Sequence, residues 1–200
     1  MTTRDGTPNF NPPEVQVPAH VPVMLAEVMA ALAPTDRRIY VDATYGDGGY
    51  SREILNSAEC NVVALDRDPQ AAARARQEAA EWNRRLTVVE GRFGEMDSLL
   101  HAQGFPGGAI SGVAMDLGAS SLQLGDPARG FSFSADGPLD MRMSRQGPTA
   151  ADVVNSMAER DFAEMLSRLG GERYARRIAG VVVEARARAP IGRTKQLADL

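Results

Sequence analysis

The sequence predicts an α/β fold, with a doubly wound parallel sheet in the first half of the chain and helices in the second. Three observations carry this prediction. Short apolar runs alternate with helical segments as far as residue 117, as in β-α-β units joined by right-handed crossovers. A glycine-rich turn directly follows the first of these runs. Beyond residue 148 only helical periodicity is left.

The chain begins with a polar, proline-rich stretch, residues 1–19, which we expect to form a disordered arm. A helix is predicted between Val23 and Pro34, because four apolar residues recur on one face and the proline ends the segment. The four residues are Leu25, Val28, Met29 and Leu32.

The alternating region contains four predicted strands, at residues 39–44, 61–66, 86–90 and 112–117. Helices are predicted between them, at residues 51–57, 69–83 and 95–102. The second helix has the clearest start. Asp68 can cap its N-terminus, and Pro69 stands at the first position, where a missing N–H costs nothing.

A long segment, residues 118–148, contains five glycines and three prolines without a clear period. Such a segment inside a compact protein is either disordered or functional. Its apolar content favours a functional segment: Phe131, Phe133, Leu139, Met141 and Met143. Helices follow, one capped by Thr149, two at residues 161–169 and 172–188, and one capped by Thr194.

The composition limits the chemistry that this chain can support. Two hundred residues, of which 44% are hydrophobic, suffice for one domain or for one domain and the start of a second. The single cysteine, Cys60, excludes an intramolecular disulfide, and two scattered histidines do not suggest a zinc site. Because neither a membrane-spanning run nor a signal peptide is evident, we expect a cytoplasmic protein without membrane association.

Charge is distributed unevenly along the chain. The net charge is −4, but residues 172–200 carry seven basic and three acidic side chains, so this end is +4 and the rest is −8. Arg173, Arg176 and Arg177 are predicted to lie on one helix. A basic end is typical of a surface that meets a polyanion such as RNA. A solvated helix face is the alternative interpretation.

The turn YGDGGY, residues 45–50, joins the first strand to the next helix. Glycines at this place let a ligand approach the backbone and the N–H groups of the helix. The dinucleotide pattern G-x-G-x-x-G is incomplete, because Ser51 stands at the third glycine. A P-loop is excluded, since no Gly-Lys-Ser/Thr occurs. A tight turn that only packs helix against strand is the alternative.

Asp66 strengthens the prediction of an adenosine-containing cofactor. It ends the second strand, 20 residues after Gly46, where a carboxylate can accept both ribose hydroxyls. The alternative is that Asp66 caps the following turn. These residues do not distinguish NAD from S-adenosyl-L-methionine. However, a nicotinamide enzyme needs a proton donor near the end of strand four, where Asp116 stands and no histidine or lysine follows closely.

Seven motifs occur in order along residues 20–200. They are HVPVMLAEV (His20–Val28), DATYGDGGYS (Asp42–Ser51), ALDRDPQA (Ala64–Ala71), DLGASSLQL (Asp116–Leu124), RGFSFSADGPLDMRM (Arg129–Met143), GERYARRIA (Gly171–Ala179) and RTKQLA (Arg193–Ala198). Together they resemble the MraW-type 16S rRNA cytosine-N4 methyltransferases. The fifth motif is highly specific to that family.

This resemblance implies a class I (Rossmann-like) methyltransferase fold, with a helical substrate-binding domain inserted after strand four. It divides the chain into the arm (1–19), an incomplete S-adenosyl-L-methionine-binding methyltransferase domain (20–124), and an incomplete loop and helical substrate-binding domain (125–200). It also implies the residues of the cofactor site. These are Gly48, Gly49 and Tyr50 around the methionine part, Asp66 on the ribose, Phe93 by the adenine, and Asp116 and Gln123 near the methionine and the incoming base.

By the same resemblance, the chain methylates the exocyclic N4 of a cytosine in 16S rRNA of the small ribosomal subunit. This nitrogen is a poor nucleophile, so a site must orient it and accept hydrogen bonds from the amine. Asp116 is the expected catalytic residue. The 118–148 segment and the arginine-rich helices are expected to hold the RNA, and a homodimer is a further expected partner state.

Family members continue beyond residue 200 with a last third that completes the helical domain and the sheet. In their strand order a fifth strand lies beside strand four. We therefore expect strand four to form an open edge that exposes Val113, Met115 and Leu117. Two alternatives to the methyltransferase stay open: a nicotinamide-dependent oxidoreductase, and a non-catalytic RNA-binding remnant.

Overall fold

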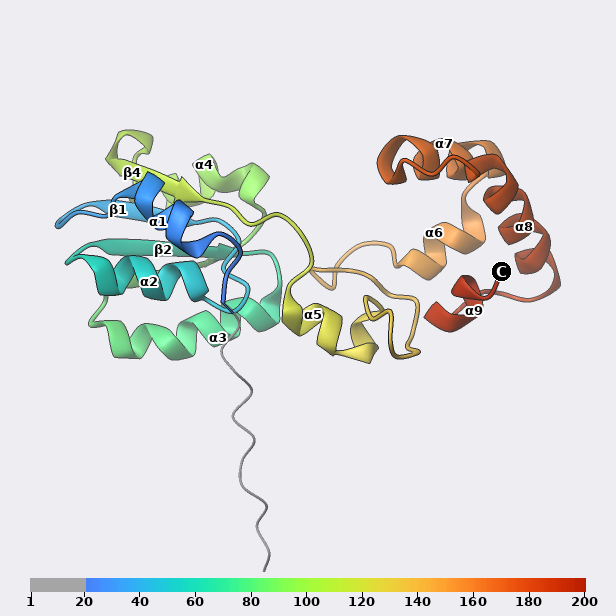
Figure 1. Cartoon of the computed structure of the whole chain (residues 1–200), viewed down its shortest axis with the longest axis horizontal. Helices are drawn as coiled ribbons and strands as arrows, with labels where there is room; N and C mark the ends of the chain where they lie inside the picture. The colour runs from blue at the N-terminus through green and yellow to red at the C-terminus, as the bar shows by residue number, and fades with distance from the viewer. Residues whose placement is uncertain (1–20) are drawn as a thin grey trace, which may run out of the picture.

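The computed structural model describes residues 21–200, so the arm predicted at residues 1–19 lies outside the described part. Figure 1 shows a sheet with its flanking helices at one end of the molecule and a separate group of helices at the other. The segment that contains α5 (Ser121–Gly125) lies between the two groups. None of the helices within residues 21–200 is long and apolar enough to cross a bilayer.

The sheet is parallel, with the strand order β3-β2-β1-β4. Its strands are β1 (Ile39–Asp42), β2 (Asn61–Asp66), β3 (Leu86–Glu90) and β4 (Ile110–Ala114). The predicted doubly wound α/β fold is therefore confirmed. The second and third strands have the predicted bounds, and the first ends two residues earlier.

The fourth strand differs most from its prediction, which placed it at residues 112–117. β4 begins at Ile110 and ends at Ala114. It ends there because β1 stops beside it: the N–H of Ala43 donates to the carbonyl of Ala114, and the N–H of Asp116 donates to the Thr44 hydroxyl at 2.7 Å. Asp116 thus belongs to the loop that follows the strand.

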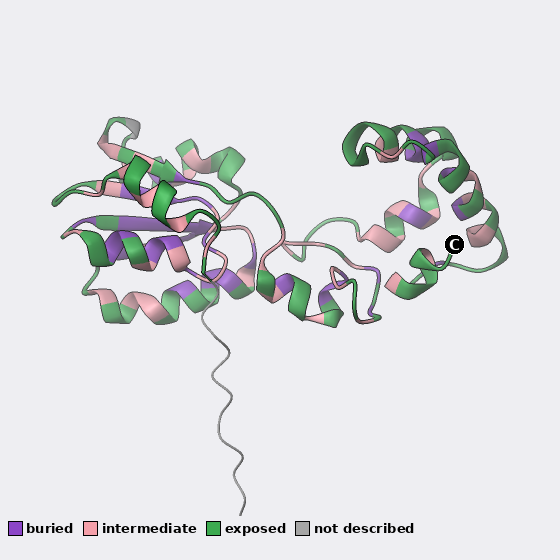
Figure 2. Ribbon diagram, in the orientation of Figure 1, coloured by how far each residue is buried: buried purple, intermediate pink, exposed green. Residues whose placement is uncertain are grey.

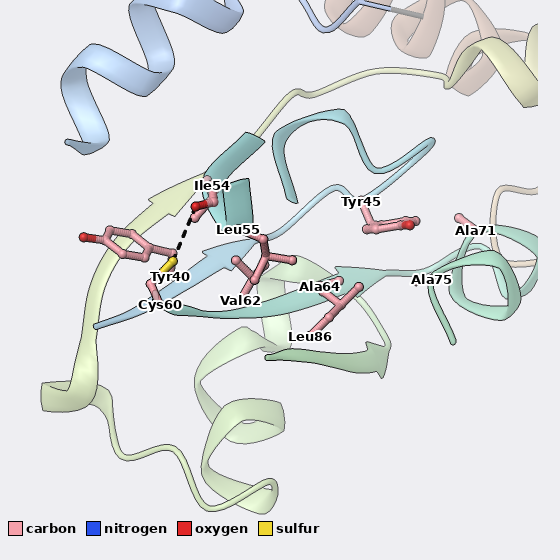
Figure 3. Packing of buried hydrophobic residues seen from close by; sticks show 10 residues of the cluster. All are labelled: Tyr40, Tyr45, Ile54, Leu55, Cys60, Val62, Ala64, Ala71, Ala75 and Leu86. Carbon is pink, nitrogen blue, oxygen red and sulfur yellow. Dashed lines mark hydrogen bonds between the residues drawn. The ribbon is translucent and has the colours of Figure 1, made fainter. Parts of the chain in front are cut away.

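Alternate residues of the strands fill two cores, one on each face of the sheet. On one face Tyr40, Val62 and Ala64 pack against Ile54 and Leu55 of α2 (Gly49–Ser57), as Figure 3 shows. The other face carries Val41, Val63, Leu65 and Val89, packed against Leu100 of α4 (Met96–Ala102). Figure 2 shows the buried residues of the sheet concentrated in the two inner strands, β1 and β2, whereas β4 alternates between half-buried and exposed residues up to the buried Ala114.

The remaining helices of this part follow the sequence prediction. In α1 (Leu25–Leu32) the four predicted apolar residues are half-buried, and the other four residues are exposed. In α3 (Pro69–Ala79) the Asp68 carboxylate accepts a hydrogen bond from the N–H of Gln70, so the predicted cap is confirmed. The helical segment ends in a 3₁₀ turn, Ala80–Trp82.

The helices beyond residue 148 have a core of their own. They are α6 (Ala150–Ser156), α7 (Glu159–Gly170), α8 (Ala175–Arg188) and α9 (Thr194–Ala198). The buried residues shared by these helices and the segments beside them are Leu139, Val154, Phe162, Ala163, Ala179, Val182 and Ile191. Leu139 comes from the 118–148 segment, so that segment is folded into the protein and is not a plain linker.

The two threonine caps have different outcomes. Thr149 caps α6 in a reciprocal capping box with Asp152, as predicted. Thr194 does not cap α9, so that prediction is wrong. Its hydroxyl accepts the N–H of Gly137, and the free N–H of Lys195 is instead accepted by the Asp136 carboxylate at 3.1 Å. A carboxylate from a distant loop has replaced the local cap.

β4 forms one edge of the sheet described here, as predicted. Val113 lies in this strand and is 37% exposed, as expected. Met115 and Leu117, 53% and 65% exposed, lie in the loop after the strand and not in the strand itself. An edge strand presents unpaired N–H and C=O groups that can pair with another chain.

We predict that the 200-residue chain self-associates through this edge. Val113→Lys combined with Met115→Lys should weaken the association, because an apolar side chain contributes about 1.5–3 kcal/mol when fully buried. Sedimentation velocity of parent and variant measures the change. Leu169→Lys is the matched control, since Leu169 is equally apolar and 73% exposed but lies on α7. Identical profiles for the parent and the double variant would exclude this edge as the site of association.

Candidate functional site

A cleft of about 500 Å³ opens at the carboxyl ends of β1, β2 and β4. β1 pairs with β2 on one side and with β4 on the other, so the chain changes direction across the sheet at this point. Ligands of open α/β sheets bind in the crevice at such a switch point. The cleft is lined by the loops after β1, β2 and β4, by Phe93 after β3, and by Met143 of the 118–148 segment.

The glycine turn forms the floor of the cleft. Gly46 and Gly48 have φ angles of +53° and +80°, which L side chains rarely adopt. A Cβ at Gly49 would overlap the ring of Pro22, so glycine is required there by close packing. The turn thus brings the N-terminus of α2 close to the open space of the cleft, as the sequence predicts.

Asp66 fixes the two loops that meet in this cleft. Its Oδ2 accepts the N–H of Gly46 and its Oδ1 accepts the N–H of Asp68, both at 2.8 Å. The predicted alternative, that Asp66 organises the following turn, is therefore correct in part. Each carboxylate oxygen retains a lone pair, so Asp66 can still accept hydrogen bonds from a ligand. Burial raises the pKa of Asp66 above its usual value.

Asp42 lies beneath the same turn and was not singled out from the sequence. It is fully buried at the end of β1, and its Oδ2 accepts hydrogen bonds from the hydroxyl of Ser51 at 2.7 Å and from its N–H at 3.2 Å. Burial raises the pKa of Asp42 to about 6, against the opposing effect of these hydrogen bonds. A carboxyl group within an apolar strand was the signal available in the sequence.

Tyr50 and Asp116 both line the cleft. The Tyr50 hydroxyl donates to the carbonyl of Val23, which ties α2 to the segment before α1. Burial, and after it the charge of Asp116, raises the pKa of Tyr50. Asp116 is exposed, and its carboxylate makes no hydrogen bond to any residue between 21 and 200, so it is free to accept one.

Phe93 and Gln123 lie in the cleft with different environments. Phe93 stands in a 3₁₀ turn, Phe93–Glu95, and is 44% exposed, so it is not part of the hydrophobic core. Gln123 is buried on α5: its amide oxygen accepts the N–H of Ser120, and its Nε2 donates to Asp68 at 2.7 Å. The amide of Gln123 therefore orders the wall of the cleft.

Six of the seven residues predicted for the cofactor site line this one cleft. The seventh, Gly48, is the residue before α2 and lies just outside the lining. The structure adds Arg67 and Met143, which the sequence did not predict for the site. Arg67 directly follows Asp66 in the chain, and Met143 ends the motif RGFSFSADGPLDMRM, so both adjoin features that the sequence did indicate. Nowhere in residues 21–200 do three or more His, Cys, Asp or Glu side chains form a group that could hold a metal ion.

A second cavity, of about 1120 Å³, lies between α7 and α8. It is lined by five arginines, three glutamates and the exposed Tyr174. The arginines are Arg160, Arg168, Arg173, Arg176 and Arg177, and the glutamates are Glu159, Glu164 and Glu172.

Comparison with known proteins decides the family. Residues 18–200 match the MraW methylase family, which is nearly the whole chain. The chain belongs to this family. Its parallel four-stranded sheet with flanking helices is therefore the Rossmann-like α/β fold of a methyltransferase, as the resemblance implied.

Relatives within the family are about half identical to this chain. It is 52% identical over 181 residues to a protein of Parvibaculum lavamentivorans named "Ribosomal RNA small subunit methyltransferase H", covering 90% of this chain and 53% of the relative. Proteins of the same name from Paramagnetospirillum magneticum and Rhodospirillum centenum are each 50% identical, covering 90% and 94% of this chain and 56% and 57% of the relatives. This MraW-family chain thus spans about half the length of the curated relatives it matches.

We predict that Asp42 makes the stability of this MraW-family chain depend on pH. Because its pKa is raised in the folded state, from 3.8 to about 6, its contribution is fully present below pH 3.8 and is lost as pH rises through about 6. The loss is about 3 kcal/mol, at 1.36 kcal/mol per pKa unit. Asp42→Asn removes the titrating group. As pH rises between these two values, the free energy of unfolding of the variant should therefore increase relative to the parent's by that amount.

Urea unfolding of parent and Asp42→Asn at a series of pH values measures this difference. Ser51→Ala is a useful second variant, since the Ser51 hydroxyl lowers the pKa of Asp42, and its removal should extend the loss of stability to a higher pH than in the parent. A constant difference between the parent and Asp42→Asn across the range would show that Asp42 does not titrate there.

Proposed function

We propose that this protein transfers a methyl group from S-adenosyl-L-methionine to the exocyclic N4 of a cytosine in 16S rRNA, in the cytoplasm. Membership of the MraW methylase family supports the methyl transfer. The name of its relatives supports ribosomal RNA of the small subunit as the substrate. The observation that carries the proposal is the single cleft that holds the glycine turn, Asp66, Phe93 and Asp116 together.

The residues of the cleft fit an adenosyl group with a charged amino-acid tail. Asp66 has lone pairs free for two ribose hydroxyls, and the exposed ring of Phe93 offers a flat apolar face for adenine. Pro22 packs against Gly49, and the positive φ of Gly46 shapes a turn that lines the cleft where we place the methionine part. S-adenosyl-L-methionine supplies an electrophilic methyl group on its sulfonium when it is bound.

Asp116 is the group that we assign to the cytosine amine. The amine nitrogen forms the new C–N bond as the S–C bond breaks, and it must give up one proton. A carboxylate that accepts a hydrogen bond from this N–H raises the electron density on nitrogen and can receive the proton. Asp116 is exposed to the cleft and free of other hydrogen bonds among the described residues, as this role requires.

We propose that the second cavity, a groove between α7 and α8, binds the RNA backbone. Of the seven basic residues in 172–200, four are engaged within the protein: Arg186 donates to the carbonyls of Val154 and Met157, and Arg188, Arg193 and Lys195 form ion pairs. The other three, Arg173, Arg176 and Arg177, all line the groove. Arg173 lies in the turn before α8, not on that helix as expected.

Arginine binds phosphate well because its planar guanidinium donates in pairs. Tyr174, 62% exposed, adds an aromatic ring on which a base can stack. The groove therefore combines the two kinds of contact that single-stranded RNA requires. Since three glutamates stand against five arginines, the lining carries a net charge of +2.

Family membership disfavours the nicotinamide-dependent oxidoreductase considered above. Thermal protection of the protein by S-adenosyl-L-methionine and not by NAD distinguishes the two. The non-catalytic RNA-binding remnant is distinguished by methyl transfer to small-subunit particles. The proposed methyltransferase predicts transfer, and a remnant predicts RNA binding alone.

We predict that Asp66→Ala weakens the binding of S-adenosyl-L-methionine by about 2–4 kcal/mol, because hydrogen bonds to a charged group contribute about 1.5–3 kcal/mol each. Isothermal titration calorimetry measures the affinity. Asp97→Ala on α4 is the matched control, since Asp97 is exposed and lies outside the cleft. An unchanged dissociation constant for a folded Asp66→Ala would remove Asp66 from the site.

We predict that Arg173→Gln combined with Arg177→Gln weakens RNA binding and flattens its salt dependence, by about 0.7–0.9 in log–log slope for each phosphate that is no longer neutralised. Binding of single-stranded RNA over a range of salt concentrations gives the slope. Arg76→Gln with Arg188→Gln is the control, because it removes the same charge at sites that are exposed and already paired. If both double variants change the slope equally, net charge and not the groove determines binding.

A further inference from the structure

One buried carboxylate, that of Asp68, connects α3 to the segment that contains Gln123 and Arg129. Asp68 caps α3 with its Oδ1, and its Oδ2 accepts from Gln123 Nε2 and from Arg129 Nη1, both at 2.7 Å. All three side chains are nearly inaccessible, with exposures of 3%, 4% and 2%. Gln123 and Arg129 are 55 and 61 residues away in the chain, so these bonds join two distant segments.

Arg129 extends the connection to the loop at the cleft's far side. Its Nη2 donates to the carbonyls of Arg142 and Met143, at 3.2 and 2.9 Å, and its Nη1 also donates to Gln70 Oε1 at 2.9 Å. Met143 lines the cleft. The guanidinium therefore holds Met143 at a fixed distance from the N-terminus of α3, using donors on both of its ends.

The same carboxylate is linked to the opposite side of the cleft through the backbone. The N–H of Asp68 donates to Asp66, which in turn accepts the N–H of Gly46. A continuous run of hydrogen bonds thus extends from the glycine turn to Met143. Its two ends, Gly46 and Met143, both line the cleft, and its middle, at Asp68 and Arg129, is buried.

We propose that Arg129 is a positioning residue that couples the cofactor side of the cleft to the substrate side. A ligand that orders Asp66 and the glycine turn also orders Asp68, and through Arg129 it fixes the segment 126–143. Arg129 and Asp68 are both deeply buried, so separating them would leave two uncompensated charges inside the protein. The ion pair therefore stays formed in the folded state. This inference rests on the proposed function only in taking S-adenosyl-L-methionine as the ligand.

Arg129→Lys tests the coupling. Lysine retains the charge beside Asp68 but not the planar fork that reaches both carbonyls, so the segment 126–143 should be released while the cofactor residues stay in place. Hydrogen exchange followed by mass spectrometry should show peptides of 126–143 exchanging at least about tenfold faster than in the parent. Peptides of β1 and β2 should exchange at the parent rate.

The coupling itself is read from the effect of the cofactor. In the parent, S-adenosyl-L-methionine should slow exchange in 126–143. In Arg129→Lys it should bind with a dissociation constant close to the parent's, measured by calorimetry, and leave 126–143 unprotected. Arg76→Gln is the control, since it removes an exposed guanidinium from α3, the helix that Asp68 caps, and should retain the parent's response.

Each outcome has a separate meaning. Cofactor-dependent protection of 126–143 that survives in Arg129→Lys overturns the proposal and makes Arg129 an ordinary packing residue. Failure of the folded parent to bind S-adenosyl-L-methionine overturns the proposed function instead. Should Arg129→Lys not fold, Gln70→Ala serves in its place, because it removes only the bond between Gln70 and Arg129 and should weaken the same protection.

Discussion

The site depends on one carboxylate, that of Asp66, which holds two loops at the switch point of the sheet. A parallel sheet brings the ends of β1 and β2 to the same edge, but it does not fix the loops that leave them. Asp66 does so by accepting one backbone N–H from each loop. Each such bond to a charged acceptor is about twice as strong as one between neutral groups. The shape of the glycine turn, the cap of α3 and the position of Asp68 all follow from this arrangement.

Asp42 shows what this arrangement costs. A second carboxyl group lies under the same turn, fully buried, and desolvation outweighs its hydrogen bonds with Ser51 and Thr44 so far that its pKa rises to about 6. Satisfying the backbone N–H groups of a tight, glycine-rich turn requires acceptors, and carboxylates are strong ones. The order of the turn is thus obtained at the expense of the protein's stability near neutral pH.

The features of the fold that could be predicted from the sequence are those that depend on neighbouring residues. The bounds of β2, the cap of α3 by Asp68 and the cap of α6 by Thr149 depend on residues within a few positions of one another, and all were confirmed. The failure at Thr194 has the opposite cause, since its partners Gly137 and Asp136 are 57 and 58 residues away.

In the candidate site too, residues marked by a local pattern could be predicted, and contacts between distant segments could not. Asp66 and the glycine turn could be found because strand ends and glycines mark a ligand crevice in any sheet of this kind. Phe93 and Gln123 came from the family resemblance alone, whereas Asp116 was also indicated by its place at the end of the fourth predicted strand. The places of all three in the cleft depend on long-range packing. Arg129 lay inside a recognised motif, yet its hydrogen bonds with Asp68, Gln70 and Met143 could not be inferred, because they exist only once distant segments have folded together.

The strand order has a consequence for how the cleft is assembled during folding. Residues paired between β1 and β2, such as Ile39 and Asn61, are 22 positions apart, whereas Ile39 and its partner Ile110 in β4 are separated by 71. Closing the longer loop costs about 1 kcal/mol more in chain entropy. Pairing β4 with β1 therefore costs more chain entropy than pairing β1 with β2, and on a ribosome the loop with Asp116 emerges after the loops that follow β1 and β2. The carboxylate that we propose for catalysis is thus the part of the cleft whose placement depends on the most distant strand pairing.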